Sequence, residues 1–304
     1  MVCMSKGTKL ITILTPTYNR GYILSKAYQS LLQQTNKNFE WLIIDDGSVD
    51  NTKELINGFI EENKINIRYF LKKNGGKHTA VNEGVKLAKG YYTIILDSDD
   101  FLTDDAIEKI NYYWEKYNNN KKIACLSFLK IYSDKRSVSK PYIGAEVISN
   151  DIDFKYNKGI TGDMSEVYRT SILKKYPFPV FGDERFLSEA IVWNKIAFKY
   201  DTVFINKGIY VCEYLEDGLS YSCLKLRYNN PIGALENAKL FMNYRFKLLI
   251  RLKNAILYDG FSLIAKRQFG YIVRESNHKF LSILFYPAGI LFKFWCTYEV
   301  KKGK

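Results

Sequence analysis

Residues 74–100 read NGGKHTAVNEGVKLAKGYYTIILDSDD, and this stretch decides the fold. A glycine-containing loop is followed by a helix-like segment at 79–89 and by an apolar run at 92–96 that ends in DSDD. A helix that leads from a loop into a buried strand is half of a βαβ unit. The stretch therefore predicts an α/β protein in which a strand ends in an acidic loop.

The residues before this stretch repeat the same alternation. Strands are predicted at 10–15, 41–44 and 67–71, with helices at 22–34 and 51–63 between them. Strands that alternate with helices form a parallel sheet, and ligands bind at the carboxyl ends of such strands. We expect a mostly parallel central sheet with a ligand site at that edge.

The pattern weakens after residue 117, where shorter elements are predicted. They are a strand at 123–132, an irregular polar stretch at 134–153, helices at 164–176 and 188–198, strands at 202–205 and 209–213, and a loop at 216–230. From Pro231 onward the pattern becomes helical and basic. We therefore expect a catalytic domain at 1–230, with halves at about 9–110 and 120–230, and a helical C-terminal region at 231–304.

Charge is concentrated in this C-terminal region. The chain carries 45 Lys and Arg against 32 Asp and Glu, a formal charge of +13. Residues 240–304 hold twelve of these basic residues and three acids, 12 − 3 = +9. A uniformly basic chain would indicate nucleic acid, whereas a basic tail rich in aromatic residues indicates an anionic membrane surface. We expect a membrane partner and no nucleic acid.

The most apolar part of the tail is 280–295, FLSILFYPAGILFKFW. It is sixteen residues long and contains Pro287, Gly289 and Lys293, whereas a membrane-spanning helix needs about 20 apolar residues. We predict an interfacial helix; packing onto the catalytic domain and a re-entrant or oligomer contact are the alternatives. The five cysteines show no CxxC spacing, and the N-terminal residues show no signal peptide, so we expect a cytoplasmic protein on the inner face of the cell membrane.

The acidic run supplies the strongest chemical feature. Asp97 and Asp99 follow an apolar strand, and two carboxylates at a strand end can turn toward one point. Hard divalent cations such as Mg²⁺ and Mn²⁺ prefer such oxygen ligands and would bridge the phosphates of a nucleoside diphosphate. The alternative is a solvated acidic turn.

Two other strand ends carry polar groups of a kind that binds nucleotides. Residues 15–20 read TPTYNR, where Tyr18 is suited to stack on a base while Asp46, after the next strand, accepts a hydrogen bond from a pyrimidine N–H. The loop at 74–78 places Lys77 near a helix N-terminus, which attracts phosphate. Each segment alone is equally compatible with an ordinary turn or loop, and the loop lacks the spacing of a P-loop.

Together, the motifs TPTYNR, WLIIDDGSVDNT and NGGKHTAVNEGVKLAKGYYTIILDSDD resemble the family 2 glycosyltransferases of capsule and exopolysaccharide synthesis. The resemblance covers residues 9–110 and, more loosely, 160–215. It implies the GT-A fold, which is Rossmann-like, and an inverting hexosyltransferase that uses a nucleotide sugar, most often a UDP sugar.

The resemblance also implies roles for individual residues. Asp97 and Asp99 would hold Mn²⁺ or Mg²⁺, Asp99 most directly. Lys77 would lie near the donor ribose or phosphates, where His78 is the alternative. The remaining donor-binding residues that the resemblance implies are Pro16, Thr17, Tyr18, Asp46 and Ser98.

An inverting transfer also needs a general base for the acceptor hydroxyl. By resemblance, the matching stretch is GDERFLSEAIVW at 182–193, in which Glu189 takes the position of the base, with Glu184 and Asp183 as the next choices. Ser188 replaces an acid that the family has at the preceding position, which puts the assignment in doubt. A helix-capping role for Glu189 is the alternative.

Two further segments are candidates for substrate contacts. Asp163 would hold a sugar hydroxyl or, alternatively, cap the helix predicted at 164–176. Residues 213–220 would form a loop that closes over donor and acceptor. The basic tail favours a polyprenyl-diphosphate-linked saccharide as the acceptor, with a soluble or protein acceptor as the runner-up. A nucleotidyltransferase and an inactive membrane scaffold are the more distant alternatives.

Overall fold

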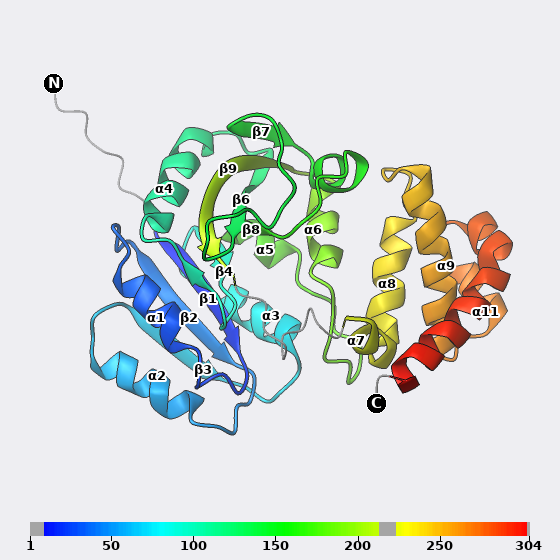
Figure 1. The fold of residues 1–304 in the computed structure, drawn as a ribbon, viewed down its shortest axis with the longest axis horizontal. Coiled ribbons are helices and arrows are strands. Elements are labelled where there is room, and N and C mark those ends of the chain that lie inside the picture. The colour runs from blue at the N-terminus through cyan, green and yellow to red at the C-terminus, as the bar shows by residue number, and fades with distance from the viewer. Residues whose placement is uncertain (1–8, 213–222, 303–304) are drawn as a thin grey trace. The chain divides into compact units, whose positions relative to one another are not determined.

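The computed structural model describes residues 9–212 and 223–302, which form two compact units (Figure 1). The first unit is built from the described parts of Met1–Asn150, Ile160–Pro177 and Ile196–Glu213, and the second from those of Asp151–Gly159, Phe178–Lys195 and Tyr214–Lys304. This grouping by contacts is not the same as the boundary expected after residue 230. The boundary between a catalytic domain and a C-terminal region after residue 230 stays a prediction.

A central sheet organises the first unit. Its described strands are β1 (Ile11–Thr17), β2 (Phe39–Asp45), β3 (Ile67–Leu71), β4 (Tyr92–Ile95), β5 (Phe101–Leu102), β6 (Ile123–Ile131), β7 (Glu146–Ser149), β8 (Met164–Arg169) and β9 (Asp201–Val211). Their order is β3-β2-β1-β4-β8-β6-β9-β5, with β7 paired to β9. Strands β3, β2, β1 and β4 are parallel, and β8 is antiparallel to both of its neighbours. The predicted α/β fold is confirmed, with a sheet that becomes mixed beyond β4.

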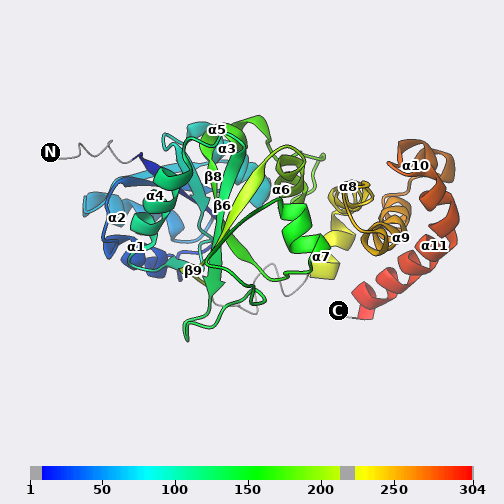
Figure 2. The ribbon, with the colours of Figure 1, turned by 90° about the horizontal axis from the view of Figure 1, so that it is seen from above.

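Helices cover both faces of the parallel half of this sheet (Figure 2). They are α1 (Ser25–Leu32), α2 (Thr52–Glu61), α3 (Lys77–Leu87), α4 (Ala106–Tyr117) and α5 (Thr170–Lys175). Successive residues of a strand point to opposite faces, so Ile13 packs with the cluster of α1, α2 and α4, while Leu14 meets α3. A further helix, α6 (Ala190–Ala197), is divided between the two units.

The core beneath α1 and α2 is aromatic. Trp41 is fully buried, and its ring stacks with Tyr28 at 6.1 Å between centroids, while Tyr28 stacks with Phe59 at 4.0 Å. The indole N–H of Trp41 donates to the Thr15 hydroxyl at 2.9 Å, which satisfies its one buried donor. These contacts fix α1 and α2 on β1 and β2, the strands whose ends carry two of the predicted motifs.

Several predicted elements after residue 130 are wrong. Residues 164–169 are strand β8 and not the start of a helix, and α5 begins only at Thr170. The polar stretch 134–153 contains strand β7, and the two strands predicted at 202–213 are one strand, β9. The predicted loop at 216–230 contains a helix, α7 (Cys223–Asn229).

The second unit is helical, as predicted for the tail. It contains the π-helical turn η1 (Ile152–Asn157), α7, α8 (Pro231–Phe241), α9 (Leu248–Ile264), α10 (Phe269–Glu275) and α11 (Lys279–Lys302). Helix α9 packs against α8 and α11 around Leu235, Tyr258 and Phe261.

Helix α11 is longer than the sequence indicated. It runs for 24 residues and continues through Pro287 and Gly289. By length and composition it is the one described helix that is long and apolar enough to cross a membrane, although 22% of its most apolar window is buried inside the protein.

Candidate active site

The ends of the parallel strands bring the predicted motifs to one edge of the sheet. Thr17 and Asp45 are opposite each other in the register of β1 and β2, and the backbone N–H of Asp46 donates to the Thr17 carbonyl at 2.8 Å. Tyr18 follows directly, with 47% of its side chain exposed. The two residues predicted to bind a base therefore lie at adjacent strand ends, with one ring open to solvent.

Asp46 also holds the glycine loop. Its carboxylate accepts hydrogen bonds from the backbone N–H groups of Gly75 at 3.0 Å and Gly76 at 2.7 Å, and from the Lys72 ammonium at 2.5 Å. Gly76 has φ +91°, a conformation that residues with a side chain rarely adopt. The buried carboxylate thus fixes the backbone that leads into α3.

Helix α3 is drawn close to the sheet by a second glycine. A Cβ at Gly84 would lie 2.1 Å from Leu14 Cδ1, so a larger residue would push the helix away from β1. Lys77 is the first residue of α3, and its Nζ lies 2.5 Å from Asp97 Oδ1. The structure therefore joins the glycine loop to the acidic run through this ion pair, which spacing along the sequence did not predict.

The acidic run is electrostatically strained. Burial opposes the ionisation of Asp97, but the ammonium groups of Lys77 and Lys130 outweigh it and lower the pKa of this carboxyl. Burial and the Asp97 charge raise the pKa of Asp99. Burial and the same charge raise the pKa of Asp100 to about 7. One carboxylate is held ionised while its neighbours resist ionisation, which is a common sign of a functional site.

These carboxylates fit a divalent cation that is shared with a diphosphate. No group of three or more His, Cys, Asp or Glu that would hold a metal by itself occurs among the described residues. Mg²⁺ is usually bound through one or two carboxylates together with substrate phosphates. Asp97 and Asp99 meet that requirement, and a bound cation would relieve the repulsion that raises the pKa of Asp99.

Three residues of this site were missed from the sequence. The Tyr210 hydroxyl on β9 accepts the backbone N–H of Asp97 at 3.0 Å, and Lys130 on β6 lies over the Tyr210 ring, 4.3 Å from its centroid. Lys72 pairs with Asp46 at the other end of the site. All three reach the site through strand pairing or loop packing, so no local sequence motif marks them.

The remaining donor-side residues are buried near the same edge. Pro16 lies in β1, the side chains of Thr17 and Ser98 are 3% and 8% exposed, and the Thr17 hydroxyl has no hydrogen bond to a described residue. Burial lowers the pKa of His78, so its imidazole is neutral and offers no charge to a phosphate. Lys77 is therefore the better of the two candidates for that role.

Asp163 lies at this edge by strand register. Ile94 is opposite Val167 in the antiparallel pair of β4 and β8, so the start of β8 lies beside the loop that follows β4. Because residues 164–169 form a strand, the helix-capping alternative for Asp163 is wrong. The position remains compatible with a contact to substrate.

The three predicted bases belong to the second unit. The Glu184 carboxylate accepts the backbone N–H groups of Ile232 and Gly233, both at 2.7 Å, and therefore caps the start of α8. Asp183 is exposed, and Glu189 directly precedes α6. Glu184 thus has a structural task, whereas Glu189 keeps its place as the candidate base. The predicted closing loop at 213–220 lies outside the described residues.

Open α/β sheets bind their ligands at the carboxyl ends of the strands, and here that edge carries polar groups and carboxylates. Residues 12–176, more than half of the chain, match the family described as glycosyl transferase family 2. The chain belongs to this family.

Relatives with curated names support the same assignment. An uncharacterized glycosyltransferase of Mycoplasma pneumoniae is 29% identical over 210 residues, which cover 68% of this chain and 66% of that protein. The chondroitin synthase of Pasteurella multocida is 38% identical over 130 residues, 43% of this chain and 12% of the synthase. The chain thus spans only part of the length of these relatives.

Solved structures support the fold. S. aureus TarS residues 1–349 in complex with UDP-GlcNAc has a TM-score of 0.58 at 16% identity, over 97% of this chain and 92% of that one. The mannosyltransferase PcManGT from Pyrobaculum calidifontis, in complex with GDP-Man and Mn²⁺, has a TM-score of 0.58 at 15% identity, over 96% and 84% of the two chains. Both likenesses confirm the GT-A fold.

Proposed function

We propose that the chain transfers a sugar, with inversion, from a UDP sugar to a saccharide carried on a polyprenyl diphosphate. The observation that carries this proposal is the pairing of Lys77 with Asp97, beside Asp99 and the loop fixed by Asp46. This edge of the sheet thus has carboxylates suited to a cation and an ammonium group suited to phosphate. It also has an exposed ring, Tyr18, suited to a base. A donor other than a UDP sugar and a soluble acceptor are the runners-up.

The residues divide the work of the transfer among them. Tyr18 stacks on the base. Asp46 positions the base in two ways: it holds the glycine loop, and its remaining lone pairs accept a hydrogen bond from the base. Asp97 and Asp99 would hold Mn²⁺ or Mg²⁺, and the cation would supply positive charge to offset that of a departing diphosphate. Lys77 pairs with the same phosphates, Asp163 contacts a sugar, and Glu189 takes the proton of the acceptor hydroxyl.

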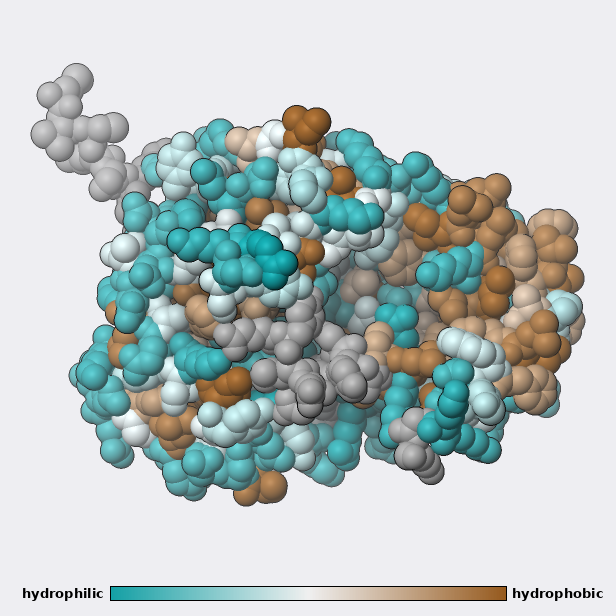
Figure 3. Space-filling model, in the orientation of Figure 1, coloured by the Kyte–Doolittle hydropathy of each residue, from teal (hydrophilic) through white to brown (hydrophobic). Residues whose placement is uncertain are grey.

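Helix α11 supports an acceptor at a membrane. Its large exposed apolar side chains are Phe280, Ile283, Leu284, Ile290, Leu291, Phe294, Trp295 and Tyr298. They recur at helical spacing on the side that faces away from α9, and Figure 3 shows apolar side chains gathered over the helical unit. With Lys279, Lys293 and Lys301 on the same helix, this surface fits an anionic lipid bilayer, at which a lipid-linked acceptor resides.

Donor turnover tests the proposal. The native chain would hydrolyse or transfer one sugar from a panel of UDP and GDP sugars, only with Mn²⁺ or Mg²⁺. Asp99→Asn should reduce that rate by about 100-fold or more, because it removes a charged ligand of the cation. Asp104→Asn, which changes an exposed carboxylate on the next loop, is the matched control and should leave the rate unchanged. A rate that survives Asp99→Asn, or needs no metal, would refute the cation site.

A further inference from the structure

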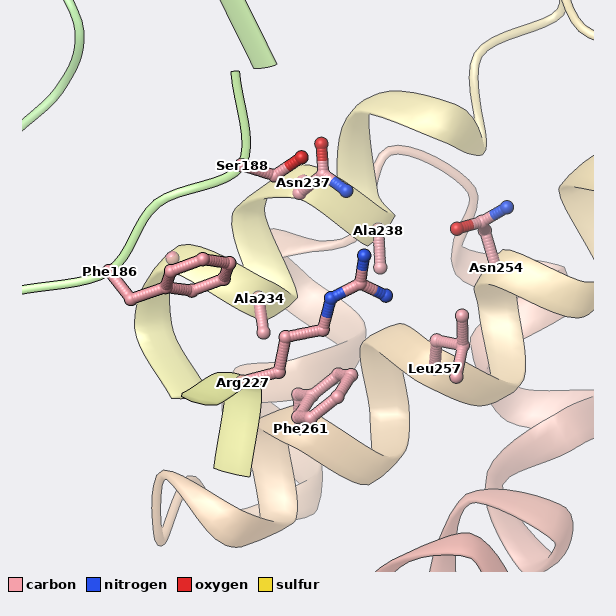
Figure 4. A pocket seen from close by; sticks show the side chains of 10 residues that line it. Phe186, Ser188, Arg227, Ala234, Asn237, Ala238, Asn254, Leu257 and Phe261 are labelled. Carbon is pink, nitrogen blue, oxygen red and sulfur yellow. The ribbon is translucent and has the colours of Figure 1, made fainter. Parts of the chain in front are cut away.

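A pocket with mixed chemistry lies within the second unit, among α7, α8, α9 and the segment before α6 (Figure 4). Arg227 of α7 reaches into it, and Ser188 and Asn237 present polar groups to it. Phe186 and Phe261 supply apolar walls. The space inside amounts to about 40 Å³, where one water molecule needs roughly 10–15 Å³. It accepts one small polar group and not a sugar ring.

The guanidinium group of Arg227 has no counter-charge. Among the described residues it forms no hydrogen bond or ion pair, although the side chain is only partly exposed. Asn237 Oδ1 is buried beside it and is also without a partner. The amide oxygen and nitrogen are interchangeable by rotation, so Asn237 can present its N–H₂ to the pocket instead. An anion would satisfy both side chains at once.

Glu184, which lies beside the pocket, does not fill this role. Glu184 approaches Gly233, which lines the pocket, but its two oxygens accept the backbone N–H groups at the start of α8. Among the described residues that line the pocket, Arg227 is the only charged one. Planar, bidentate guanidinium groups are the preferred protein partners of phosphate and carboxylate.

The pocket adjoins the proposed base along the chain. Ser188 lines it, and Glu189 is the next residue, only about 3.8 Å away between Cα atoms. A group bound to Arg227 is thus within a side chain's reach of the residue that would accept the acceptor proton. This step rests on the proposed function.

The apolar walls continue into the core between α9 and α11. Leu257 and Phe261 of α9 line it, and the Phe261 ring contacts Phe292 of α11 at 5.3 Å between centroids. A ligand that carries an anion next to a hydrocarbon chain matches this arrangement better than a free sugar phosphate does.

We propose that Arg227, with Ser188 and Asn237, binds a phosphate of the acceptor's lipid carrier. The subsite would hold one phosphate of the carrier's diphosphate while the saccharide extends toward Glu189. Arg227 is then a residue of acceptor specificity, because it distinguishes diphosphate-linked saccharides from free ones, and the donor site does not require it.

Binding of farnesyl diphosphate, a short prenyl diphosphate, tests the subsite directly. The assay is titration calorimetry on the full chain with EDTA present, so that no metal bridges the diphosphate to Asp97 and Asp99. Arg227→Ala should weaken binding about tenfold or more, since it removes charge-assisted hydrogen bonds. Arg227→Lys should lose part of the affinity. Arg274→Ala, an exposed arginine of the same unit, is the matched control and should bind as the native chain does.

Other ligands separate the possible sources of binding. Farnesol, which lacks phosphate, should bind the native chain and Arg227→Ala equally, since only the apolar surface is left to hold it. UDP should not displace farnesyl diphosphate, because the proposed UDP site is in the first unit and the pocket is in the second. Equal affinity of native chain and Arg227→Ala for farnesyl diphosphate, with an unchanged melting temperature, would overturn the subsite, and so would displacement by UDP.

Turnover distinguishes this proposal from the function on which it rests. Arg227→Ala should raise the KM for a diphosphate-linked acceptor about tenfold and leave donor hydrolysis and transfer to the free saccharide unchanged. If the native chain shows no turnover of any donor, the proposed function fails, while the calorimetric result still decides the anion subsite.

Discussion

Lys77 connects two parts of the site that separate motifs had indicated. Its ammonium pairs with Asp97, while its backbone follows a loop held by Asp46. A divalent cation and the Lys77 ammonium compete for the same carboxylate, so the lysine must release Asp97, at least in part, when a cation binds. Donor phosphates would offer Lys77 a replacement partner, which couples cation binding to nucleotide binding.

This coupling makes a prediction for Lys77→Ala. Without the competing ammonium, Asp97 is free for the cation, and Mn²⁺ affinity in the absence of nucleotide should rise about threefold to tenfold. Affinity for UDP should fall, because a phosphate partner is lost. Electron paramagnetic resonance of free Mn²⁺ measures the first effect. Lys86→Ala, an exposed lysine on the same helix, should change neither affinity, and unchanged Mn²⁺ binding in Lys77→Ala would contradict the competition.

The two glutamates before α6 should respond in opposite ways to substitution. Glu189→Gln should lower kcat by about 10²–10⁴ and leave UDP binding unchanged, because it removes the proposed base and no donor-binding group. Glu184→Ala should instead lower the free energy of unfolding by about 1–3 kcal/mol, because two backbone N–H groups of α8 lose their acceptor. Urea unfolding and kcat, measured on both variants, separate the roles. The reverse pattern would identify Glu184 as the base.

For single residues, the sequence predicted which polar side chains lie at the ends of strands. It did not predict which other side chains they contact. Asp46, Lys77, Asp97 and Asp99 were found because each follows a strand or starts a helix. Tyr210 was not found, since it enters through β9, which lies more than a hundred residues along the chain. Local patterns place a residue in the fold, whereas the partner of a side chain depends on pairing between distant segments.

At the scale of elements, the same distinction explains the misassigned segment 164–176. Its apolar residues recur at helical spacing, but 164–169 pairs as β8 with β4 on one side and β6 on the other. Two ladders of backbone hydrogen bonds outweigh a weak local preference for helix. The strands at 67–71 and 123–132 were predicted well, because these segments are short and rich in apolar residues, which favours a strand over a helix.

Helices α9 and α11 enclose a carboxyl group that has no use in the proposed mechanism. Asp259 of α9 is fully buried, and a polar group that faces it is the Ser282 hydroxyl of α11, which donates to Ser276. Gly289 of α11 lies against it, where an added Cβ would come within 2.6 Å of Asp259 Cβ. Burial raises the pKa of Asp259 to about 7.

This buried group predicts a pH dependence of stability. The folded state binds the proton more tightly than the unfolded chain, whose Asp pKa is about 3.9, so stability should fall as pH rises from about 4 to about 7 and stay low above that. Asp259→Asn should weaken this dependence, with the rest left to Asp100, and raise the melting temperature at pH 8. Thermal unfolding from pH 5 to 8 measures it, with Glu299→Gln as the control. A native chain that is equally stable at pH 5 and pH 8 would contradict the prediction.

For the whole molecule, the question is what covers the apolar side of α11. One side of this helix is occupied, since Leu281, Gly289 and Cys296 are buried within the helical unit, but Leu291 and Phe294 are 71% and 65% exposed. A helix that packs on α9 along its whole length exposes only part of its circumference to lipid. Such a helix is suited to lie in the interface, where basic residues contribute attraction to anionic lipid.

Vesicle flotation tests this orientation. The native chain should bind vesicles with phosphatidylglycerol better than neutral ones, and less at high salt. Leu291→Glu combined with Phe294→Glu should reduce binding at least about tenfold, since each apolar side chain contributes roughly 1.5–3 kcal/mol on burial. Ile143→Glu, equally apolar and 98% exposed but in the first unit, should have no effect. Substitution is preferable to deletion, because α8 and α9 share a core that truncation would expose. Resistance to extraction by alkaline carbonate would mean that α11 spans the bilayer, and the contacts of Leu281 and Gly289 with α9 would then lie within the membrane.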